Sequence, residues 1–375
     1  MTSVGGRPEL FVVIMAGGAS SRLWPESRST RPKWLLDVGN GQSLLRQAYD
    51  RAVAAAGSPD RTLVVTSEPQ AEIVAQELPL LPRHNIIAEP DAKDTAGCAA
   101  LAAAIIGNRR QSDPNVLIAL FPGDQIIQPQ DRFVDAIRNA ASLATQEKKI
   151  VTIGIIAQSP ATGFGYIHRA APVDGLPGAY CVERFVEKPD VETAREYLQS
   201  GEYYWNAGIF VFRYADILEQ FAADLPDHAD GIRRLASLPA DIDAAGFRSE
   251  IERAYASWKK VSIDFGIIEG ASKRGRIAVV AGAVDWSDVG SWSSIGEHLP
   301  ADADGNSVRA DALVINGKEN IVFCRDRNKR VVLLDVSGLF VVDTPDALLI
   351  GRRESDQQVK NVVSRLKADG RSDLL

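Results

Sequence analysis

Several residue types are scarce in this chain of 375 residues, and each scarcity excludes a class of protein. The three cysteines, Cys98, Cys181 and Cys324, are too few and too scattered for a disulfide framework or a paired metal-binding motif. We expect all three to be reduced and buried. The longest apolar stretch, residues 97–106, is too short and too rich in alanine to cross a membrane. Residues 1–9 lack the basic start and apolar segment of an export signal, so a cytoplasmic location is expected.

An excess of positive charge is also lacking. The chain has 42 Lys and Arg against 49 Asp and Glu, a formal net charge of −7, which is the wrong sign for a nucleic-acid-binding surface. The hydrophobic (45%) and charged (24%) shares lie near the averages of soluble globular proteins, which excludes a disordered or fibrous chain. A folded, enzyme-like body of about two or three domains is therefore expected, without nucleic-acid or membrane partners.

Strand-like and helix-like segments alternate over the first 300 residues. Four uninterrupted apolar runs are typical of strands buried on both faces of a mostly parallel sheet: residues 10–15, 62–66, 116–121 and 150–156. Between them lie three helical stretches: residues 44–56, 96–106 and 133–144. This order predicts an α/β fold.

The sequence changes character after residue 300. A turn-rich segment, Pro300 to Asn306, precedes four short β-type runs: residues 312–315, 321–324, 331–335 and 339–343. Residues 355–367 place four apolar side chains at helical spacing, which predicts a short amphipathic closing helix. We therefore expect an α/β domain over residues 1–299 and a β-rich module with a closing helix over residues 300–375.

The first predicted strand leads into a loop, residues 17–33, that combines glycines, serines and cations. Glycine and serine let backbone N–H groups approach phosphate oxygens, while Arg22 and Lys33 can neutralise charge that builds up in phosphoryl chemistry. The spacing matches neither the dinucleotide-binding Gly-x-Gly-x-x-Gly nor a P-loop, and Pro25 and Pro32 argue against a helix directly after the glycines. The alternative is an ordinary glycine-rich turn with solvated cations.

Two aspartates are candidates for a metal site. Asp124 follows the predicted strand at 116–121, at the carboxyl end where open α/β sheets bind ligands. Asp288 lies far along the chain, before Val289-Gly290. Mg²⁺ usually takes one or two carboxylates together with phosphate oxygens and waters, so two aspartates converging on a nucleotide suffice. A turn aspartate and a capping aspartate are the alternatives.

Glu89 begins a polar segment that precedes the helical stretch at 96–106. A carboxylate can accept both donors along one edge of guanine, N1–H and N2–H₂, whereas it would repel the acceptor N1 of adenine. Glu89 is therefore a candidate reader of the base. Asp94 or Thr95 is expected to cap the helix.

Four segments resemble signature motifs of the sugar-phosphate nucleotidylyltransferase family: Arg22-Leu-Trp-Pro25, Phe185-Val-Glu-Lys-Pro189, Trp205-Asn-Ala-Gly-Ile-Phe210 and Ser262-Ile-Asp-Phe-Gly266. The first of them is similar to the loop of mannose-1-phosphate guanylyltransferases. The resemblance runs from Ile14 to Trp292, and the C-terminal segment also resembles the small β-helix-like module of the family. The chain departs from the family pattern at Lys93, Asp94, Gly97 and Gln125.

The resemblance implies a Rossmann-like α/β fold of the nucleotide-diphospho-sugar transferase type, with a mixed, mostly parallel sheet flanked by helices. It implies GTP and α-D-mannose 1-phosphate as substrates, GDP-mannose and pyrophosphate as products, and Mg²⁺ as cofactor. The residues it assigns are Arg22, Lys33 and Lys188 to catalysis; Ala16, Gly17, Gly18, Ser20, Ser21, Glu89, Pro90, Thr95 and Gly123 to the nucleotide; Gly165, Glu187, Asn206 and Asp264 to the sugar; and Asp124 and Asp288 to the metal.

Other functions stay open at this stage. The same chemistry could use another nucleotide or another sugar 1-phosphate, such as a manno-heptose, and a non-catalytic regulatory subunit could bind the sugar nucleotide. A nicotinamide-dependent oxidoreductase is disfavoured by the missing Gly-x-Gly-x-x-Gly. Bifunctional relatives carry an extra isomerase domain for which 375 residues leave no room, so a single activity is expected. Composition leaves open whether the β-rich module forms a homodimer or packs back on the catalytic domain.

Overall fold

The computed structural model describes residues 9–18, 20–239, 244–326 and 328–375. Residues 1–8, in the segment expected to lack an export signal, lie outside the described residues. The chain divides into two compact units. Unit 1 comprises the residues up to 16, 48–122 and 127–286, and unit 2 comprises 17–47, 123–126 and 287–375. This division differs from the expected single boundary at 299–300, because an N-terminal segment packs with the C-terminal one.

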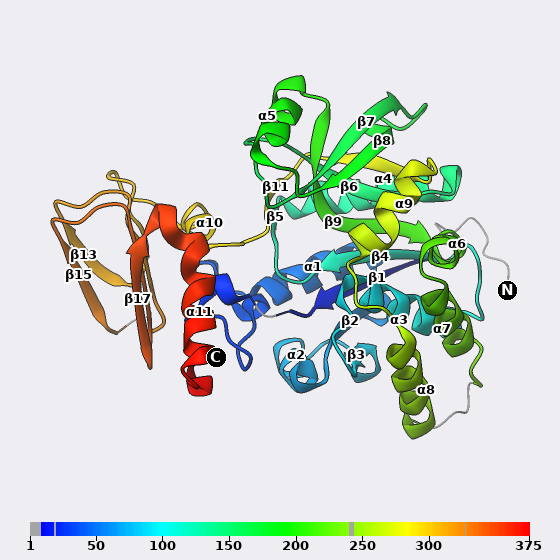
Figure 1. The fold of residues 1–375 in the computed structure, drawn as a ribbon, viewed down its shortest axis with the longest axis horizontal. Coiled ribbons are helices and arrows are strands. Elements are labelled where there is room, and N and C mark those ends of the chain that lie inside the picture. The colour runs from blue at the N-terminus through cyan, green and yellow to red at the C-terminus, as the bar shows by residue number, and fades with distance from the viewer. Residues whose placement is uncertain (1–8, 19, 240–243, 327) are drawn as a thin grey trace. The chain divides into compact units, whose positions relative to one another are not determined.

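A nine-stranded mixed sheet forms the centre of unit 1 (Figure 1). Its strands are β1 (Leu10–Ala16), β2 (Thr62–Ser67), β3 (Ile86–Glu89), β4 (Leu117–Pro122), β6 (Ile150–Ile156), β7 (Gly165–Pro172), β8 (Ala179–Glu187), β9 (Tyr203–Arg213) and β10 (Ile277–Gly282). The order is β3-β2-β1-β4-β9-β6-β10-β8-β7. The first four of these positions are parallel, whereas β9 runs antiparallel to β4 and β6, and β8 is antiparallel to β7 and β10. The expected mixed sheet is confirmed.

Helices cover both faces of this sheet. The helices of this part of the chain are α1 (Leu44–Ala56), which starts in unit 2, then α2 (Ala71–Glu77), α3 (Asp94–Arg109), α4 (Gln130–Glu147), α5 (Val191–Ser200), α6 (Tyr214–Asp224), α7 (Pro226–Ala236), α8 (Ala244–Ser257) and α9 (Glu269–Lys273). Of these, α7 packs on α3 and α6, and α8 packs on α7. Phe11 and Val13 pack in one core with α3, while Val12 and Ile14 are equally buried. Because side chains alternate along a strand, the second pair faces the opposite side of the sheet.

Helix α3 is buried along almost its whole length, since it packs on β1 and β2 and is itself covered by α7. The expected cap of this helix is wrong. Lys93 occupies the cap position without a side-chain bond. The Asp94 carboxylate accepts from the adjacent Thr95 amide at 2.7 Å, and the Thr95 hydroxyl accepts from the Ile263 amide at 2.8 Å. The Thr95 side chain therefore binds a distant segment, and neither polar side chain caps the helix.

Unit 2 contains a module of parallel rungs. Its elements are α10 (Trp292–Gly296), β12 (Ser307–Arg309), β13 (Asp311–Ile315), β14 (Ile321–Cys324), β15 (Arg330–Leu334), β16 (Leu339–Thr344), β17 (Ala347–Arg352) and α11 (Val359–Ala368). Strands β12, β14 and β16 stack in parallel, β13 and β15 form a second parallel pair, and β17 joins β16 antiparallel. Asn320 Nδ2 donates to Asn306 Oδ1 at 3.0 Å between successive buried turns. The expected β-helix-like module and its closing helix are confirmed.

The core of unit 2 joins both ends of the chain. Leu23 and Trp24 from the glycine loop share one buried cluster with Trp292, Phe323 and Phe340 of the C-terminal segment. The indole Nε1 of Trp292 also donates to the backbone oxygen of Trp24 at 3.1 Å. This shared core explains why residues 17–47 belong to unit 2. The remaining strands, β5 (Ile126–Gln128) and β11 (Asp285–Ser287), pair with each other in a two-stranded sheet.

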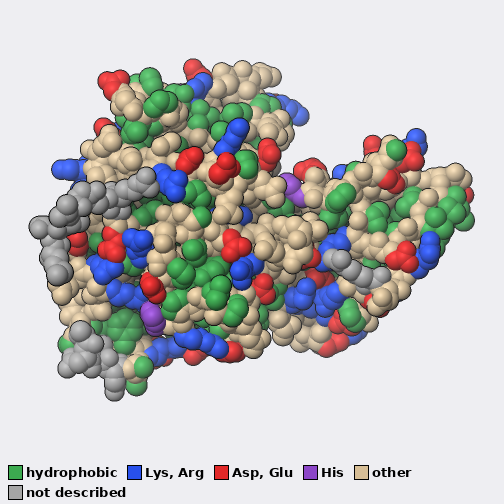
Figure 2. All heavy atoms as spheres, turned by 180° about the vertical axis from the view of Figure 1, so that it is seen from behind, with side chains coloured by type: hydrophobic (Ala, Val, Ile, Leu, Met, Phe, Trp, Pro, Cys, Tyr) green, Lys and Arg blue, Asp and Glu red, His purple; other side chains and the backbone are tan. Residues whose placement is uncertain are grey.

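The surface of the module carries an exposed apolar face. Six of the ten exposed large hydrophobic side chains among the described residues lie on β13, β15 and β17: Leu313, Ile315, Val332, Leu334, Leu348 and Ile350. Apolar side chains also gather on the module in the space-filling view (Figure 2). Four of the six line an open hollow of about 450 Å³. The homodimer stays a prediction.

Two further expectations concern membrane-spanning helices and the burial of the cysteines. In the described part of the chain no helix is both long and apolar enough to cross a membrane. All three cysteines are free thiols; Cys98 and Cys324 are buried, whereas Cys181, on strand β8, is only half-buried. Its Sγ lies 3.8 Å from Lys149 Nζ, so the expectation of burial is wrong for this one residue.

Candidate functional site

The glycine loop leaves its backbone open. Gly17 and Gly18 are exposed, and a Cβ built on either would meet no atom within 4 Å. Gly18 has a φ of +90°, a region that favours glycine. Ser20 makes no capping bond to the one-turn 3₁₀ helix Ser21–Leu23 that follows. The loop therefore presents backbone and two half-buried serine side chains, and only a single helical turn follows the glycines, as the prolines led us to expect.

Three predicted residues that are distant in sequence meet in unit 2. Lys33 Nζ donates to Asp124 Oδ2 at 2.7 Å and to the backbone oxygen of Asp288 at 2.5 Å. Lys33 is buried, with 8% of its surface exposed, whereas both aspartates are half-buried. A single ammonium group thus contacts one predicted metal ligand through its carboxylate and the other through its backbone oxygen. We call these residues the lysine–aspartate cluster.

Local geometry positions each member of the cluster. Lys33 begins a 3₁₀ turn directly after Pro32, and Asp124 occupies the turn between β4 and β5. A Cβ on Gly290 would lie 2.7 Å from Asp288 Oδ2, so glycine at this position leaves room for the carboxylate. The Asp288 carboxylate therefore occupies space that a side chain at position 290 would fill.

The donor set of the cluster suits a hard cation bound together with phosphate. No group of three or more His, Cys, Asp or Glu side chains within the described ranges is arranged to hold a metal alone. Mg²⁺ in nucleotide sites usually takes one or two carboxylates and completes its shell with phosphate oxygens and waters. Asp124 Oδ1 and the Asp288 carboxylate are not used in the contacts with Lys33. The residues present therefore fit Mg²⁺ accompanied by a polyphosphate.

Arg22 is held apart from this cluster by a different partner. Its Nη1 donates to Gln357 Oε1 at 3.3 Å, in the 3₁₀ turn before α11. The structure thus brings Lys33, but not Arg22, to the two aspartates. Sequence reasoning had no signal for Gln357, because it lies 335 positions away on the exposed side of a polar turn.

The predicted sugar-binding residues of unit 1 converge from four segments. Gly165 of β7 pairs in register with Glu187 of β8, and a Cβ on Gly165 would lie 2.5 Å from Glu187 Oε2 and 3.4 Å from Asn206 Cβ. Asn206 of β9 donates from Nδ2 to Asp264 Oδ1 at 2.9 Å, in the π-helix Asp264–Ile268. Lys188 Nζ donates to Glu187 Oε1 at 2.5 Å. All five side chains or backbones thus form one polar group, the sugar cluster.

The Asn206 amide is oriented by the residues around it. Its Oδ1 accepts from Thr152 Oγ1 at 2.9 Å and from the Gly208 amide at 3.2 Å. One Nδ2 hydrogen goes to Asp264, which leaves the second available to a ligand hydroxyl. Asn206 is 8% exposed and Thr152 is fully buried. Thr152 is a positioning residue that sequence reasoning missed, because it sits inside an apolar strand.

Burial changes the charge of the sugar cluster. Desolvation, followed by the nearby charge of Glu187, raises the pKa of Asp264 to about 7, although Lys188 and the bond from Asn206 oppose the rise. Near neutral pH this carboxyl exchanges between an acceptor and a donor, and both forms can bond a hydroxyl.

Aromatic rings flank the same region of unit 1. Phe164 packs edge-on against Trp205 and Trp286, with ring centroids 5.1 and 5.0 Å apart. The backbone oxygen of Phe164 accepts from the Lys188 amide at 3.2 Å, which fixes the glycine-flanked turn against the sugar cluster. The tryptophans near the motifs therefore act as packing for this turn.

The predicted base-reading segment is anchored by a tyrosine. Tyr255 of α8, which is 2% exposed, donates from its hydroxyl to Glu89 Oε1 at 2.9 Å. Desolvation raises the pKa of Glu89 to about 7; the bond from Tyr255 opposes the rise, and the charges of Asp94 and Asp91 add to it. Tyr255 was missed because an aromatic residue on a helix is more often core packing.

The other predicted nucleotide-binding residues have ordinary structural contacts. Ala16 ends β1, and its carbonyl accepts from Thr66 Oγ1 at 2.7 Å. Gly123 is buried in the turn before Asp124, Pro90 is half-buried after Glu89, and the Thr95 hydroxyl already accepts from the Ile263 amide. Their roles toward a nucleotide stay predictions.

Residues 11–305 match the family model described as nucleotidyl transferase, and residues 310–366 match one described as MannoseP isomerase/GMP-like beta-helix domain. A mannose-1-phosphate guanylyltransferase of Klebsiella pneumoniae is 39% identical over 97% of this chain and 75% of its own length. One of Escherichia coli strain K12 is 37% identical over 97% of this chain and 74% of its own length.

A solved structure shows the same similarity. It is described as a mannose-1-phosphate geranyltransferase from Thermus thermophilus, with 31% identity and a TM-score of 0.82 over 96% of this chain and 99% of its own. Two independent matches thus cover nearly the whole chain, including its β-helix module. The chain belongs to the nucleotidyl transferase family and, within it, to the group of the mannose-1-phosphate guanylyltransferases.

Proposed function

We propose that this nucleotidyltransferase moves a guanylyl group from GTP to α-D-mannose 1-phosphate, giving GDP-mannose and pyrophosphate. The observation that carries the proposal is the lysine–aspartate cluster, in the same unit as an exposed glycine loop. This combination serves a polyphosphate and a hard cation. The names of the relatives point to guanylyl transfer and mannose 1-phosphate.

The reaction is an in-line displacement at phosphorus. An oxygen of the sugar phosphate attacks the α-phosphorus of GTP, the bond from that phosphorus to the β-phosphate oxygen breaks, and pyrophosphate leaves. A phosphate monoester has a second pKa of about 6 and is mostly dianionic at neutral pH, so the attacking oxygen needs no general base. The protein then contributes positioning and charge neutralisation.

The chain supplies cations for both phosphate groups. Lys33 and Arg22 neutralise charge on the triphosphate and on the departing pyrophosphate. Lys188, whose side chain is 58% exposed beside Glu187, binds the phosphate of the sugar. Mg²⁺ bound by Asp124 and Asp288 would supply further charge neutralisation at the phosphate oxygens.

Selection of the two substrates falls to unit 1. Glu187, Asn206 and Asp264 bond sugar hydroxyls, and a sugar that leaves one of these buried groups unpaired is rejected. Glu89, in its ionised form, accepts the N1–H and N2–H₂ donors of guanine. The bond from Tyr255 leaves the other carboxylate oxygen and the remaining lone pairs available for the base.

The experiment is pyrophosphate release by the purified protein with Mg²⁺, across four nucleoside triphosphates and several sugar 1-phosphates. We expect the strongest signal for GTP with mannose 1-phosphate. A signal confined to another pair would keep the chemistry and overturn the specificity. Silence with every pair, from protein that still binds a nucleotide sugar, would favour the regulatory subunit.

The metal assignment has its own variants. Asp124→Ala is expected to abolish turnover without unfolding the protein. Asp124→Asn is the sharper variant, because its amide oxygen can still accept from Lys33 Nζ while the negative charge is lost. We expect about 100-fold or greater loss of kcat in Asp124→Asn with an unchanged melting temperature. Near-normal turnover in this variant would remove Asp124 from the metal site.

A further inference from the structure

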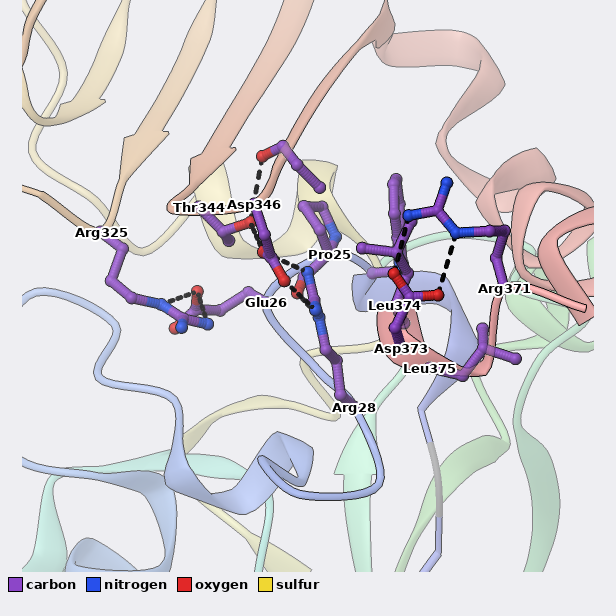
Figure 3. Close-up of polar contacts among 12 residues, drawn as sticks. Pro25, Glu26, Arg28, Arg325, Thr344, Asp346, Arg371, Asp373, Leu374 and Leu375 are labelled. Atoms are coloured by element: carbon purple, nitrogen blue, oxygen red, sulfur yellow. Dashed lines mark hydrogen bonds and ion pairs between the residues drawn. The ribbon is translucent and has the colours of Figure 1, made fainter.

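The glycine loop is bound to the C-terminal module through charged side chains at its middle. Arg28 lies between the two predicted catalytic cations, six residues after Arg22 and five before Lys33. Its guanidinium makes two parallel bonds to the carboxylate of Asp346, at 2.6 and 2.7 Å (Figure 3). The Arg28 side chain is only 10% exposed. This is the planar two-point geometry in which arginine fixes position as well as charge.

The same guanidinium also holds its own loop closed. Arg28 Nε donates to the Pro25 carbonyl at 2.9 Å. The backbone groups of Arg28 and Arg31 pair in both directions, at 2.8 and 3.1 Å, and the Ser27 amide donates to the Leu23 carbonyl at 2.9 Å. Residues 23–31 therefore form one closed turn, and a contact that fixes Arg28 fixes the turn.

The acceptor is rigid as well. Asp346 stands in the two-residue turn between β16 and β17, where Thr344 and Ala347 pair in register. Thr344, which is 4% exposed, places its hydroxyl 3.1 Å from Asp346 Oδ1. The bonds from Arg28, and then the one from Thr344, hold the pKa of Asp346 below its ordinary value. A charged acceptor on a tight hairpin is thus aimed at the loop.

A second pair of contacts binds the turn nearby. Glu26 is 1% exposed and accepts from Arg31 Nε at 2.9 Å and from Arg325 at 2.7 and 2.8 Å, just after β14. Figure 3 shows the contact of Arg325 with Glu26 as well as that of Arg28 with Asp346. The module thus contacts residues 23–31 through the Asp346 carboxylate, which binds Arg28, and through Arg325, which binds Glu26.

We propose that the Arg28–Asp346 pair is a positioning contact, through which the β-helix module sets the loop that carries Arg22 and Lys33. Neither residue touches the reacting atoms. The pair acts by keeping two predicted phosphate-binding cations at a fixed separation, and a misplacement of about 1 Å can cost about 100-fold in rate. This inference rests on the proposed function for its kinetic consequence, but the loop contact itself can be measured without turnover.

The first test is Asp346→Asn, which keeps the shape of the hairpin and removes the charge that binds Arg28. We expect kcat to fall about 10- to 100-fold, with less than about a three-fold change in KM for mannose 1-phosphate. The matched control is Glu72→Gln, because Glu72 also bonds Arg83 at two points, at 2.7 and 3.2 Å, but on the exposed surface of unit 1. A kcat within two-fold of wild type in Asp346→Asn would overturn the proposal.

A double-variant cycle separates positioning from general weakening. Arg28→Gln should lose at least as much kcat as Asp346→Asn, because it also loses the bond to Pro25. The double variant should equal Arg28→Gln, since both changes break one contact. Losses that multiply would show two independent effects and overturn the proposal.

The readout without turnover is amide hydrogen exchange in the full-length protein. The amides of Ser27, Arg28 and Arg31 should exchange faster in Asp346→Asn, while those of β4 keep wild-type protection. Unchanged exchange at the three amides would overturn the positioning contact even if kcat fell. If the wild type released no pyrophosphate with any substrate pair, the proposed function would fail, and the exchange result would still decide whether Asp346 fixes the loop.

Discussion

Glu89 and Asp264 are two acidic residues of unit 1 whose ionisation is costly. Burial is the first cause in both cases and raises each pKa to about 7. One predicted role, the reading of guanine by Glu89, requires the charged form. Burial of Glu89 therefore disfavours the charged form that this role requires. The hydrogen bond from Tyr255 opposes part of this effect.

The pKa of Glu89 has a consequence for stability. Between its ordinary value of 4.5 and about 7, the folded protein retains a proton that the unfolded chain has lost, so the free energy of unfolding falls as pH rises through this window. The contribution is fully present below 4.5, and Asp264 acts in the same direction from 3.8 to about 7. If Glu89 and Asp264 instead raised the free energy of unfolding from acid to neutral pH, their raised pKa values would be contradicted.

Glu89→Gln measures this effect. Glutamine stays neutral, so between about pH 5 and pH 8 the unfolding free energy of the variant should gain about 1–3 kcal/mol relative to wild type. Urea denaturation at several pH values gives the difference. Glu72→Gln, an exposed acidic residue on the surface of unit 1, should not show this gain. Parallel pH profiles for wild type and Glu89→Gln would show that Glu89 ionises normally in the folded protein.

Among the secondary-structure elements, the continuous apolar strands could be predicted from the sequence. The hairpin of β7 and β8, which carries predicted sugar-binding residues, could not. Strand β6 matches the predicted range 150–156, since every side chain in that run is apolar or small. Strand β7 is buried at its first three residues and exposed at its last three, the buried residues of β8 are separated by pairs of more exposed ones, and the register between the two strands shifts after His168. Periodicity alone therefore had no continuous signal there, although the motif residues that they carry were recognised.

The close approach of β7 to β8 gives a prediction. Gly165→Ala places a methyl carbon 2.5 Å from Glu187 Oε2 and 3.1 Å from the Phe185 ring. Because Glu187 must move, we expect kcat/KM for mannose 1-phosphate to fall about 10-fold or more, while KM for GTP changes little. Steady-state kinetics with each substrate varied in turn measures this.

The control for that prediction is Gly163→Ala. A Cβ at Gly163 meets nothing within 4 Å, and Gly163 lies two residues earlier, in the turn before β7. It should behave as wild type. Equal losses in both variants would mean that backbone flexibility of the turn, and not the space beside Glu187, sets the sugar affinity.

The sequence named candidate site residues but not the contacts between them. Asp124 and Asp288 were paired from the sequence through the family motifs, and the structure places both at Lys33. That Lys33 joins them could not be derived, because 91 and 255 positions separate it from the two aspartates. Arg28 was seen only as one of four cations in the loop, since its partner Asp346 carries no motif.

At the scale of the whole molecule, the boundary near residue 300 does not separate two independent bodies. Truncation after Leu299 keeps Lys33, Asp124 and Asp288 but removes Phe323 and Phe340, which share a core with the loop. We expect the fragment 1–299 to lose turnover about 100-fold or more and to become protease-sensitive within residues 17–47, since a well-packed loop loses its apolar support. Limited proteolysis read by mass spectrometry locates the cuts.

Unit 1 provides the internal control for the truncation. Its nine-stranded sheet draws on no strand beyond residue 282, so amides of β1 and β4 should keep their protection in the fragment. Full activity of the fragment would show that the loop needs no support from the module. Loss of protection throughout unit 1 would show that the two cores unfold together.

The order of synthesis gives this chain connectivity a further meaning. At about 5–20 residues per second, roughly 15 to 65 seconds pass between the synthesis of residue 47 and that of residue 375. During this time the sheet of unit 1 can form. The segment that carries Arg22 and Lys33 cannot yet pack against Phe323 and Phe340 or pair with Asp346, because these residues have not been synthesised. Unit 1 of a nascent chain can thus fold before residues 17–47 have the C-terminal partners that pack against them, so the two units need not fold at the same time.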